Sequence, residues 1–463
     1  MTTIPTAPDA EVVRRLRAVV GSANVLTDPD VLEPYLTDWT RRYRGAAIAV
    51  IRPTSTDEVS NIVKECARLR IPIVPQGGNT GLVAGSVPKA GSVLLSTTRL
   101  LDIGPVDRES SQLTVAAGVT LSRVQETATA AGLRFPVDLA ARGSATIGGM
   151  VATNAGGLSV LRFGPMRSQL AGLEAVLADG SVISHLGGLV KDNTGYDLCG
   201  LLCGSEGTLG IVTAVRLRLV PADAGRLTFV VGLDAISVAL RLLNTLRARA
   251  VVVESAELIR RAGVEMVGSH LGRTPPPALL RRFALLVEVV ASPSTVSIVA
   301  EVLDDGELCD VVVAESSSSA AELWAWRERH TESISARGVP IKLDVSLPAG
   351  ELEAFESDID GVIAAVLPSA EVHVFGHLGD GNLHVNVLGV DFDDQSLVSD
   401  VEGAILRRVV VVNGSISAEH GIGTMKTRWL HLNRSPAELR AMRMIKAALD
   451  PTALFNPGVL LPS

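Results

Sequence analysis

The chain of 463 residues has few aromatic side chains, few cysteines and no excess of positive charge. Phe, Trp and Tyr make up only 3% of it, so Val, Leu, Ile and Ala must build the core. The net charge of −8 argues against a general nucleic-acid-binding protein. It does not argue against small anionic ligands, because a local cluster of Arg and Lys can dominate the potential at one site.

Cysteine clusters and long apolar segments are absent as well. Cys66, Cys199, Cys203 and Cys309 are scattered, and Cys199 and Cys203 have no partners that would complete a zinc ribbon. We therefore expect free, buried thiols. The N-terminus shows neither the basic nor the apolar part of a secretory signal, and no apolar run approaches the roughly 18–20 residues that span a bilayer. These absences predict a cytoplasmic protein without a transmembrane segment.

The length predicts roughly two or three domains, and 47% hydrophobic with 20% charged residues is typical of a globular chain. A helix is predicted over 9–20, followed by loop-like sequence. A strand, a helix and a second strand then alternate over 47–53, 56–69 and 71–75, which indicates mixed helices and strands. The composition changes near 221–225, and strands and helices continue beyond it as a second α+β domain.

Glycine-rich loops recur in the first half of the chain. Gly77–Gly81 follows a predicted strand directly, and glycines there let backbone N–H groups approach an anion such as a pyrophosphate. This loop is neither a P-loop nor a G-x-G-x-x-G pattern, so by itself it is equally consistent with a tight turn. Two further glycine-rich segments follow, Gly143–Gly157 and Gly204–Gly210. Their recurrence in one domain favours backbone wrapped around a bound group.

A second group of motifs carries histidines. His377 and His384 flank a glycine-rich turn, and Glu419–His420 follows 35 residues after His384. Imidazoles and a carboxylate suit a borderline divalent metal such as zinc. Imidazole also has the intrinsic pKa of a general base, a role that would suit His420. The alternative is that the histidines are structural and that Gly379–Gly381 is only a tight turn.

Taken in order, these motifs resemble the vanillyl-alcohol-oxidase-like FAD-linked oxidoreductases of the PCMH-type FAD superfamily, in the branch of D-lactate and D-2-hydroxyglutarate dehydrogenases. The resemblance runs from about Ile51 to Pro462 and rests on residues 75–81, 148–157, 191–197 and 204–213, the two histidine motifs and residues 456–458.

The resemblance implies an α+β fold. A two-subdomain PCMH-type FAD-binding domain would be followed by an α+β cap domain with an antiparallel sheet and by a C-terminal helical segment that returns to the FAD domain. The expected boundaries are 1–46 for an N-terminal helical segment, 47–223 for the FAD domain, 224–425 for the cap with the metal site, and 426–463 for the C-terminal segment.

The resemblance also implies which residues bind FAD. Residues 77–82 would hold the pyrophosphate, and 136–154 and 206–212 would line the ribityl chain and the isoalloxazine. Because Asn79 stands where some members carry a flavin-linked histidine, we expect non-covalent FAD. The implied cofactor-binding residues are Pro75, Gly77, Gly78, Asn79, Thr80, Gly81, Leu82, Ser86, Pro136, Asp138, Gly143, Ser144, Thr146, Gly148, Gly149, Asn154, Glu206, Gly207, Gly210, Ile211, Val212 and Asn456.

For catalysis, the resemblance implies His377, His384 and Glu419 as ligands of one divalent metal, zinc or manganese. The metal would polarise the hydroxyl of a D-2-hydroxy acid, either 2-hydroxyglutarate or lactate, and His420 would contact this substrate and take its proton as the base. A hydride would pass to flavin N5, and the product would be the 2-keto acid.

The implied substrate-binding residues have suitable chemistry. Arg327 carries a planar fork that suits bidentate capture of a carboxylate, and Lys342 adds a point charge. Thr331, four residues after Arg327, is expected on the same helical face. Asn386, two residues after the second histidine, is expected on the same strand face as that histidine. The alternative for Arg327 and Arg329 is a solvated helix surface.

Val459 departs from the family pattern, since many relatives carry lysine there, and this changes one expected contact near the flavin. No cysteine cluster is suited to an iron–sulfur centre, so electrons are expected to pass to an external acceptor, an electron-transfer flavoprotein or a quinone.

Other interpretations keep the fold but assign a different function. These are FAD-dependent ether-lipid-type transfer, direct oxidation by oxygen, or a flavoprotein subunit of a larger glycolate- or lactate-oxidising or electron-transfer complex. Nucleic acid is not an expected partner, and a homodimer is the candidate assembly.

Overall fold

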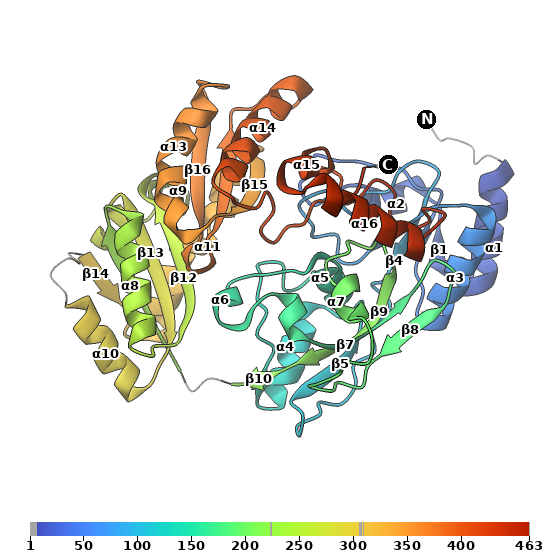
Figure 1. Cartoon of the computed structure of the whole chain (residues 1–463), viewed down its shortest axis with the longest axis horizontal. Coiled ribbons are helices and arrows are strands. Elements are labelled where there is room, and N and C mark those ends of the chain that lie inside the picture. Colours follow the sequence, from blue (N-terminus) through green and yellow to red (C-terminus); the bar gives the residue numbers. More distant parts are fainter. Residues whose placement is uncertain (1–6, 223–224, 305–307, 309, 463) are drawn as a thin grey trace. The chain divides into compact units, whose positions relative to one another are not determined.

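The computed structural model describes residues 7–222, 225–304, 308 and 310–462, which form two compact units (Figure 1). Unit 1 comprises the described residues of Met1–Gly157, Phe163–Ala222 and Glu419–Ser463, and unit 2 those of Leu158–Arg162 and Asp223–Ala418. The expected domain boundary at 223/224 and Cys309 lie outside the described residues. The chain returns to unit 1 at Glu419, earlier than the expected boundary at 425/426.

The first sheet of unit 1 has the order β1 (Val25–Leu26), β2 (Val50–Ile51), β4 (Val93–Ser96), β3 (Ile73–Gln76). Strands β2, β4 and β3 are parallel. Helix α3 (Thr56–Leu69) connects β2 to β3, and its residues confirm the helix predicted over 56–69. Ser55 caps its start by accepting the N–H of Glu58, and Arg70, with φ 57°, ends it in the left-handed region.

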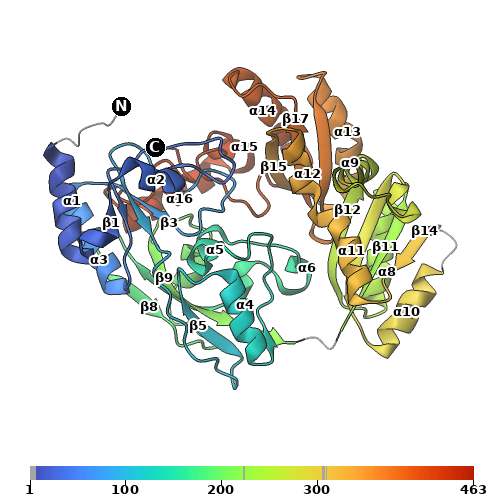
Figure 2. The same ribbon diagram turned by 180° about the vertical axis from the view of Figure 1, so that it is seen from behind.

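The second sheet of unit 1 is antiparallel and has the order β5 (Gln112–Ala116), β9 (Ile211–Arg218), β7 (Leu170–Val176), β8 (Val182–His185). Helices α4 (Leu121–Ala130) and α5 (Ile147–Thr153) follow β5 (Figure 2). Helix α5 shows that part of the glycine-rich stretch 143–157 is helical. A Cβ on Gly148 would overlap Ala117, so this glycine allows the helix to approach its neighbour closely.

The other elements of unit 1 include a helix in the region expected to be loop. Asp28 caps α2 (Pro29–Leu36) by accepting the N–H of Asp30, and Pro29 occupies the first helical turn. The chain also returns to the first sheet at its end, where Phe455 forms a parallel bridge with Ile73. The remaining elements are α1 (Ala7–Val20), α2 (Pro29–Leu36), β6 (Leu133–Arg134), β10 (Val220–Pro221), α7 (Leu198–Leu202), α15 (Leu430–Asn433) and α16 (Pro436–Leu449).

Unit 2 contains one antiparallel sheet, which confirms the antiparallel sheet expected for the cap domain. Its order is β14 (Asp310–Val313), β11 (Arg226–Leu233), β13 (Phe283–Val290), β12 (Val253–Arg260), β16 (Glu371–His377), β17 (Asn382–Leu388), β15 (Ile341–Ser346).

Helices cover both faces of this sheet (Figures 1 and 2). One layer consists of α8 (Ile236–Ala248), α10 (Pro293–Leu303), α13 (Leu352–Ala364) and α14 (Gln395–Val411). The other consists of α9 (Arg261–Leu271), α11 (Ser317–Glu328) and α12 (His330–Arg337). None of the described helices combines the length and hydropathy needed to cross a bilayer.

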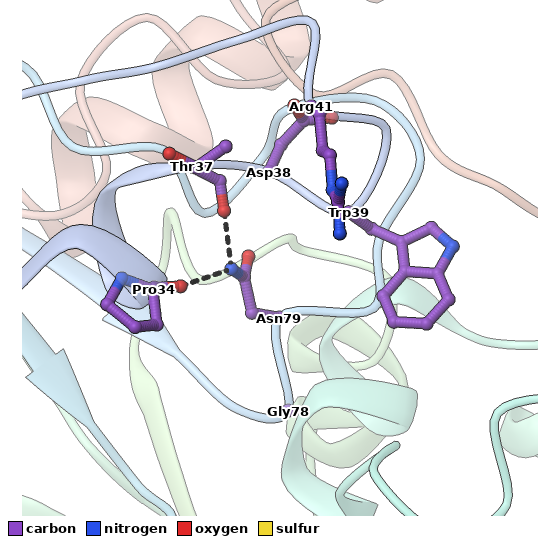
Figure 3. A pocket seen from close by; sticks show the side chains of 7 residues that line it. All are labelled: Pro34, Thr37, Asp38, Trp39, Arg41, Gly78 and Asn79. Carbon is purple, nitrogen blue, oxygen red and sulfur yellow. Dashed lines mark hydrogen bonds between the residues drawn. The ribbon is translucent and has the colours of Figure 1, made fainter.

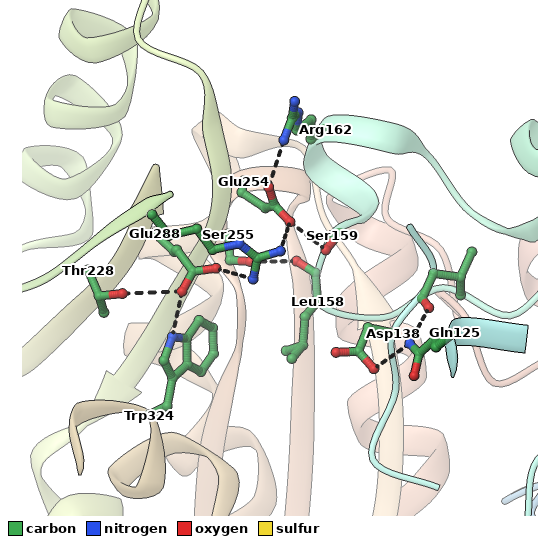
Figure 4. A network of polar contacts seen from close by, with 12 residues as sticks. Gln125, Asp138, Leu158, Ser159, Arg162, Thr228, Glu254, Ser255, Glu288 and Trp324 are labelled. Atoms are coloured by element: carbon green, nitrogen blue, oxygen red, sulfur yellow. Dashed lines mark hydrogen bonds and ion pairs between the residues drawn. The ribbon is translucent and has the colours of Figure 1, made fainter. Parts of the chain in front are cut away.

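A buried polar network fixes the segment Leu158–Arg162 to unit 2 (Figure 4). The Glu254 carboxylate, which is fully buried, accepts hydrogen bonds from Ser159 Oγ at 3.2 Å and from Arg162 Nη1 at 2.8 Å. Arg226 Nη2 donates to the same carboxylate at 3.0 Å. A buried carboxylate with these partners avoids the large cost of an unpaired charge, so the network holds this segment in place.

Candidate active site

Predicted cofactor-binding residues from distant parts of the sequence meet in unit 1. A Cβ on Gly77 would overlap Thr146 Oγ1, and a Cβ on Gly78 would overlap the carbonyl oxygen of Ser144. The loop after β3 therefore packs directly on the start of α5, and only glycine permits this approach. This closely packed glycine backbone fits an extended anionic cofactor such as FAD, because glycines let backbone N–H groups approach a phosphate closely.

A pocket of about 430 Å³ lies beside this loop and is lined by Pro34, Thr37, Asp38, Trp39, Arg41, Gly78 and Asn79 (Figure 3). Asn79 Nδ2 donates to the carbonyl oxygens of Pro34 at 3.2 Å and Thr37 at 2.8 Å. The Asn79 side chain thus holds the glycine loop against the end of α2. The contribution of α2 was not predicted, because its region was interpreted as loop.

Glu206 holds the segment that follows Glu419–His420. Its buried carboxylate accepts the N–H groups of Ile422 at 2.8 Å and Gly423 at 2.7 Å. Burial raises the pKa of this carboxyl, while these two hydrogen bonds and the charge of Lys426 oppose the shift. The side chain of this predicted cofactor-binding residue therefore fixes a loop in unit 1.

Two predicted cofactor-binding asparagines also hold backbone. Asn456 Nδ2 donates to the carbonyl oxygens of Gly85 and Glu206, both at 2.8 Å. Asn154 Oδ1 accepts the N–H of Arg167 at 2.9 Å. The other predicted cofactor-binding residues lie in the glycine-rich segments of unit 1 or within a few residues of them.

Four of the predicted metal and substrate residues lie on one face of the sheet in unit 2, namely His377, His384, Lys342 and Asn386. Glu257 of β12 lies opposite His377 of β16, and His384 of β17 lies between Phe375 of β16 and Asp344 of β15. Opposite residues of neighbouring strands share a face, as do alternate residues along one strand. All five side chains therefore project from the same face.

Lys342 and Asn386 extend this row. They lie opposite each other on β15 and β17, two residues from Asp344 and His384 respectively. Asn386 therefore lies on the same strand face as His384, as the strand alternation predicted. Burial lowers the pKa of the half-buried Lys342. Asn386 Nδ2 is buried and has no hydrogen-bond partner among the described residues, so it can donate to a ligand.

His377 and Arg327 share one buried carboxylate. Glu257 Oε1 lies 2.5 Å from His377 Nδ1, and Glu257 Oε2 accepts Arg327 Nε at 2.6 Å. Burial works to raise the pKa of Glu257, but the charges and hydrogen bonds of these two partners outweigh it and lower the pKa to about 2. Sequence analysis missed Glu257, because no local motif surrounds it and the contact to His377 spans 120 residues.

His384 has a carboxylate partner as well. Its Nδ1 lies 3.4 Å from Asp344 Oδ1, which also accepts Asn382 Nδ2 at 2.6 Å. The rings of His377 and His384 meet edge to face with centroids 5.3 Å apart. The two predicted histidine ligands are therefore neighbours. Each lies beside a buried carboxylate, Glu257 for His377 and Asp344 for His384.

A cluster that could hold a metal lies next to this pair. The ligand atoms of Asp344, His384, Glu419 and His420 all lie within 4.8 Å of one another. The nitrogen and oxygen donors suit a divalent ion such as zinc or manganese. Asp344 was not among the predicted ligands, and His377 lies beside this group of four rather than within it.

Glu419 and His420 reach this cluster through the chain that precedes them. Ser415 N donates to Ser346 O at 2.7 Å and Ala418 N donates to Asp344 O at 3.4 Å, so the segment Ser415–Ala418 runs along the end of β15. The next two residues thus follow directly from a segment that is fixed on the sheet.

The predicted substrate residues Arg327 and Thr331 do not share one helix. Helix α11 ends at Glu328 and α12 begins after a turn at Arg329, so the two residues do not lie on one continuous helix as expected. Arg327 is only 8% exposed and lies over the Phe375 ring at 4.6 Å, whereas Thr331 is exposed. Arg329 is exposed and pairs with Glu332, as expected for a solvated surface.

Two further histidines lie near this face. His330 is 1% exposed, and its ring lies 4.9 Å from that of Phe375. Burial, followed by the charge of Arg327, lowers the pKa of His330 to about 3. His373 is buried and pairs with Glu371 at 2.8 Å, as an ordinary strand residue would.

Two family models match the chain. Residues 47–185 match the FAD binding domain, and residues 224–460 match the C-terminal domain of FAD linked oxidases. The second match alone covers more than half of the chain. The protein is therefore an FAD-linked oxidoreductase.

Curated relatives narrow the assignment within this class. The chain is 38% identical to D-2-hydroxyglutarate dehydrogenase of Xanthomonas citri pv. viticola, over 96% of both chains. It is 38% identical to the mitochondrial D-2-hydroxyglutarate dehydrogenase of Bos taurus and 36% identical to that of Arabidopsis thaliana, covering 96% and 98% of this chain and 82% of each relative. The chain belongs to the D-2-hydroxyglutarate and D-lactate dehydrogenase branch of the FAD-linked oxidoreductases and is an FAD-dependent dehydrogenase.

Solved structures share the fold at lower sequence identity. A p-cresol methylhydroxylase structure has a TM-score of 0.81 at 18% identity, covering 99% of this chain and 98% of that one. The 4-ethylphenol oxidase of Gulosibacter chungangensis has a TM-score of 0.77 at 18% identity, covering 100% and 99%. An alkyldihydroxyacetonephosphate synthase reaches 0.76 at 15% identity, covering 96% and 85%. Because the chemistries named for these proteins differ, the likeness concerns the fold alone.

Proposed function

We propose that this protein oxidises D-2-hydroxyglutarate to its 2-keto acid, with FAD as the hydride acceptor and one divalent metal assisting. The observation that carries the proposal is the single sheet face on which Lys342 and Asn386 lie beside His384, next to Arg327. Two cations on this face match the two carboxylates of 2-hydroxyglutarate better than the one carboxylate of lactate. The relatives named D-2-hydroxyglutarate dehydrogenase support the same substrate.

FAD, the metal and the protein residues would each have a separate role in the reaction. When bound, FAD supplies an acceptor for the hydride, and the metal supplies a Lewis acid that lowers the pKa of a bound hydroxyl. His377, His384 and Glu419 would hold the metal, with Asp344 orienting His384. His420 would take the proton of the substrate hydroxyl at a ring nitrogen.

The carboxylates of the substrate need their own partners. Arg327 uses Nε to bond Glu257, and none of its hydrogen bonds within the described chain uses Nη1 or Nη2. This end of the guanidinium fork can therefore bind a carboxylate. Lys342 adds a second cation and Asn386 a buried amide donor, with Thr331 at the exposed margin. Electrons would then leave for an external acceptor, an electron-transfer flavoprotein or a quinone.

An anaerobic titration tests the proposal. The FAD-loaded, zinc-loaded protein is mixed with D- and L-2-hydroxyglutarate and D- and L-lactate, and loss of the visible flavin absorbance is followed. D-2-hydroxyglutarate should bleach the flavin fastest, and the L-enantiomers should not. If none of these acids bleaches the flavin while FAD and metal are verified to be present, the proposed function is wrong.

A further inference from the structure

We propose that Glu257 is a positioning residue shared by the metal site and the substrate site, orienting His377 through one carboxylate oxygen and Arg327 through the other. The inference rests on the proposed function, in which His377 binds the metal and Arg327 binds substrate. Neither the histidine motifs nor the arginine segment points to this residue.

The positions of the three residues come from rigid elements. Glu257 and His377 are directly opposed on the neighbouring strands β12 and β16. Arg327 comes from the last turn of α11, which packs on the same face of the sheet. Glu257 is 0% exposed, so water does not compete for its two contacts. A site keeps its geometry when its side chains lie on strands and helices and their rotamers are locked by such contacts.

The hydrogen bonds define what each partner presents. An ionised carboxylate only accepts, so His377 Nδ1 carries the proton and the lone pair of the ring lies on Nε2, where a metal would bind. The contact to Arg327 engages Nε and fixes the guanidinium plane over Phe375. A single buried acid thus sets the direction of the metal-binding nitrogen and of the carboxylate-binding fork.

Only a carboxylate meets both demands. Glutamine has one acceptor oxygen, and its amide group would face an N–H donor at the other contact. Asp344 is a weaker counterpart for His384, because its oxygen is 3.4 Å from Nδ1 and is shared with Asn382. We therefore expect the loss of Glu257 to weaken metal binding and substrate binding together.

The test compares Glu257→Gln with Glu254→Gln. Glu254 lies on the same strand, is equally buried and also binds arginine, but its hydrogen bonds to Ser159, Arg162 and Arg226 involve no predicted metal or substrate residue. Zinc affinity of the FAD-loaded proteins is measured by competition with a chromophoric chelator, and KM and kcat are measured with D-2-hydroxyglutarate. Glu257→Gln should bind zinc about 10–100-fold more weakly and raise KM, whereas Glu254→Gln should change neither by more than about 2-fold.

A second comparison guards against misfolding. If Glu257→Gln does not retain FAD, the charge-balanced double variant Glu257→Gln/Arg327→Gln is compared with Arg327→Gln alone. The double variant should still bind zinc about 10-fold more weakly than the single variant, because Glu257, unlike Arg327, hydrogen-bonds to His377. Equal zinc affinity in either pair overturns the inference, as does a wild-type protein that binds no zinc. A wild-type protein that binds zinc but oxidises no 2-hydroxy acid refutes the proposed function and leaves the zinc comparison intact.

Discussion

Replacing His330 with leucine should remove an acid-sensitive contribution to the stability of unit 2. The imidazole is 1% exposed, and both ring nitrogens lack a hydrogen-bond partner within the described residues. The carbonyls of Trp326 and Arg327 oppose the downward pKa shift without meeting hydrogen-bond geometry. Leucine therefore removes no hydrogen bond, and an apolar side chain of similar size should be neutral or slightly stabilising near neutral pH.

The pH dependence follows from the pKa of about 3 in the folded protein, against the ordinary value of 6.5. Between these values the unfolded chain binds a proton at His330 and the folded chain does not, so stability falls as the pH falls. Each pH unit below the ordinary pKa costs about 1.4 kcal/mol. From about pH 7.5 to about pH 5, wild type should therefore lose about 2 kcal/mol relative to His330→Leu.

Urea unfolding of the FAD-loaded protein, followed by tryptophan fluorescence at several pH values, measures this difference. Trp324 and Trp326 lie on α11 of unit 2 and report on its unfolding. Ser333→Ala is the matched control, because Ser333 lies one turn further along, is buried and does not titrate. Its hydroxyl likewise has no hydrogen-bond partner in the described part of the chain. Its stability difference from wild type should not change with pH. A pH-independent difference for His330→Leu would refute the reasoning.

Other substitutions test the cofactor loops and the catalytic group. Gly78→Ala should displace the glycine loop and reduce FAD retained after gel filtration at least about 10-fold, whereas Gly187→Ala, whose Cβ would meet nothing within 4 Å, should keep FAD. Glu206→Gln should lower unfolding free energy by about 1–3 kcal/mol in urea, because its amide cannot accept both backbone N–H groups. His420→Ala should abolish flavin bleaching while FAD stays bound; unchanged bleaching would exclude it as the base. His377→Ala should lose zinc and activity together, and full activity in a verified metal-free variant would exclude its role as a ligand.

Local patterns predicted the regular elements best. The helix predicted over 56–69 matches the bounds of α3, which the structure shows to be capped locally by Ser55. Helix α2 was missed, because it is only eight residues long and contains Pro34. The glycines of α5 suggested loop, whereas their function at Gly148 is close packing against another segment. Intrinsic preferences are weak guides where a long-range contact decides the conformation.

Spacing along a strand also predicted part of the candidate site. The two-residue interval from His384 to Asn386 placed both on one face, because strand alternation is a local property. Glu257 and Asp344 became visible only through register between strands that are far apart in sequence. No pattern within one segment encodes such a pairing. The break between α11 and α12 was missed for the opposite reason, since a turn at one residue hardly alters helical spacing.

The bridge between Ile73 and Phe455 has a consequence for biosynthesis. Ile73 N donates to Leu454 O, and Asn456 N donates to Ile73 O, so residues near the end of the chain complete the outer edge of β3. During translation the whole of unit 2 leaves the ribosome before these residues are made. Until then the edge of β3 in the nascent unit 1 is unpaired. Such an edge can pair with strands of other chains. Emergence of residues 454–456 from the ribosome, rather than synthesis of the glycine loops, should set the moment at which the chain can first retain FAD.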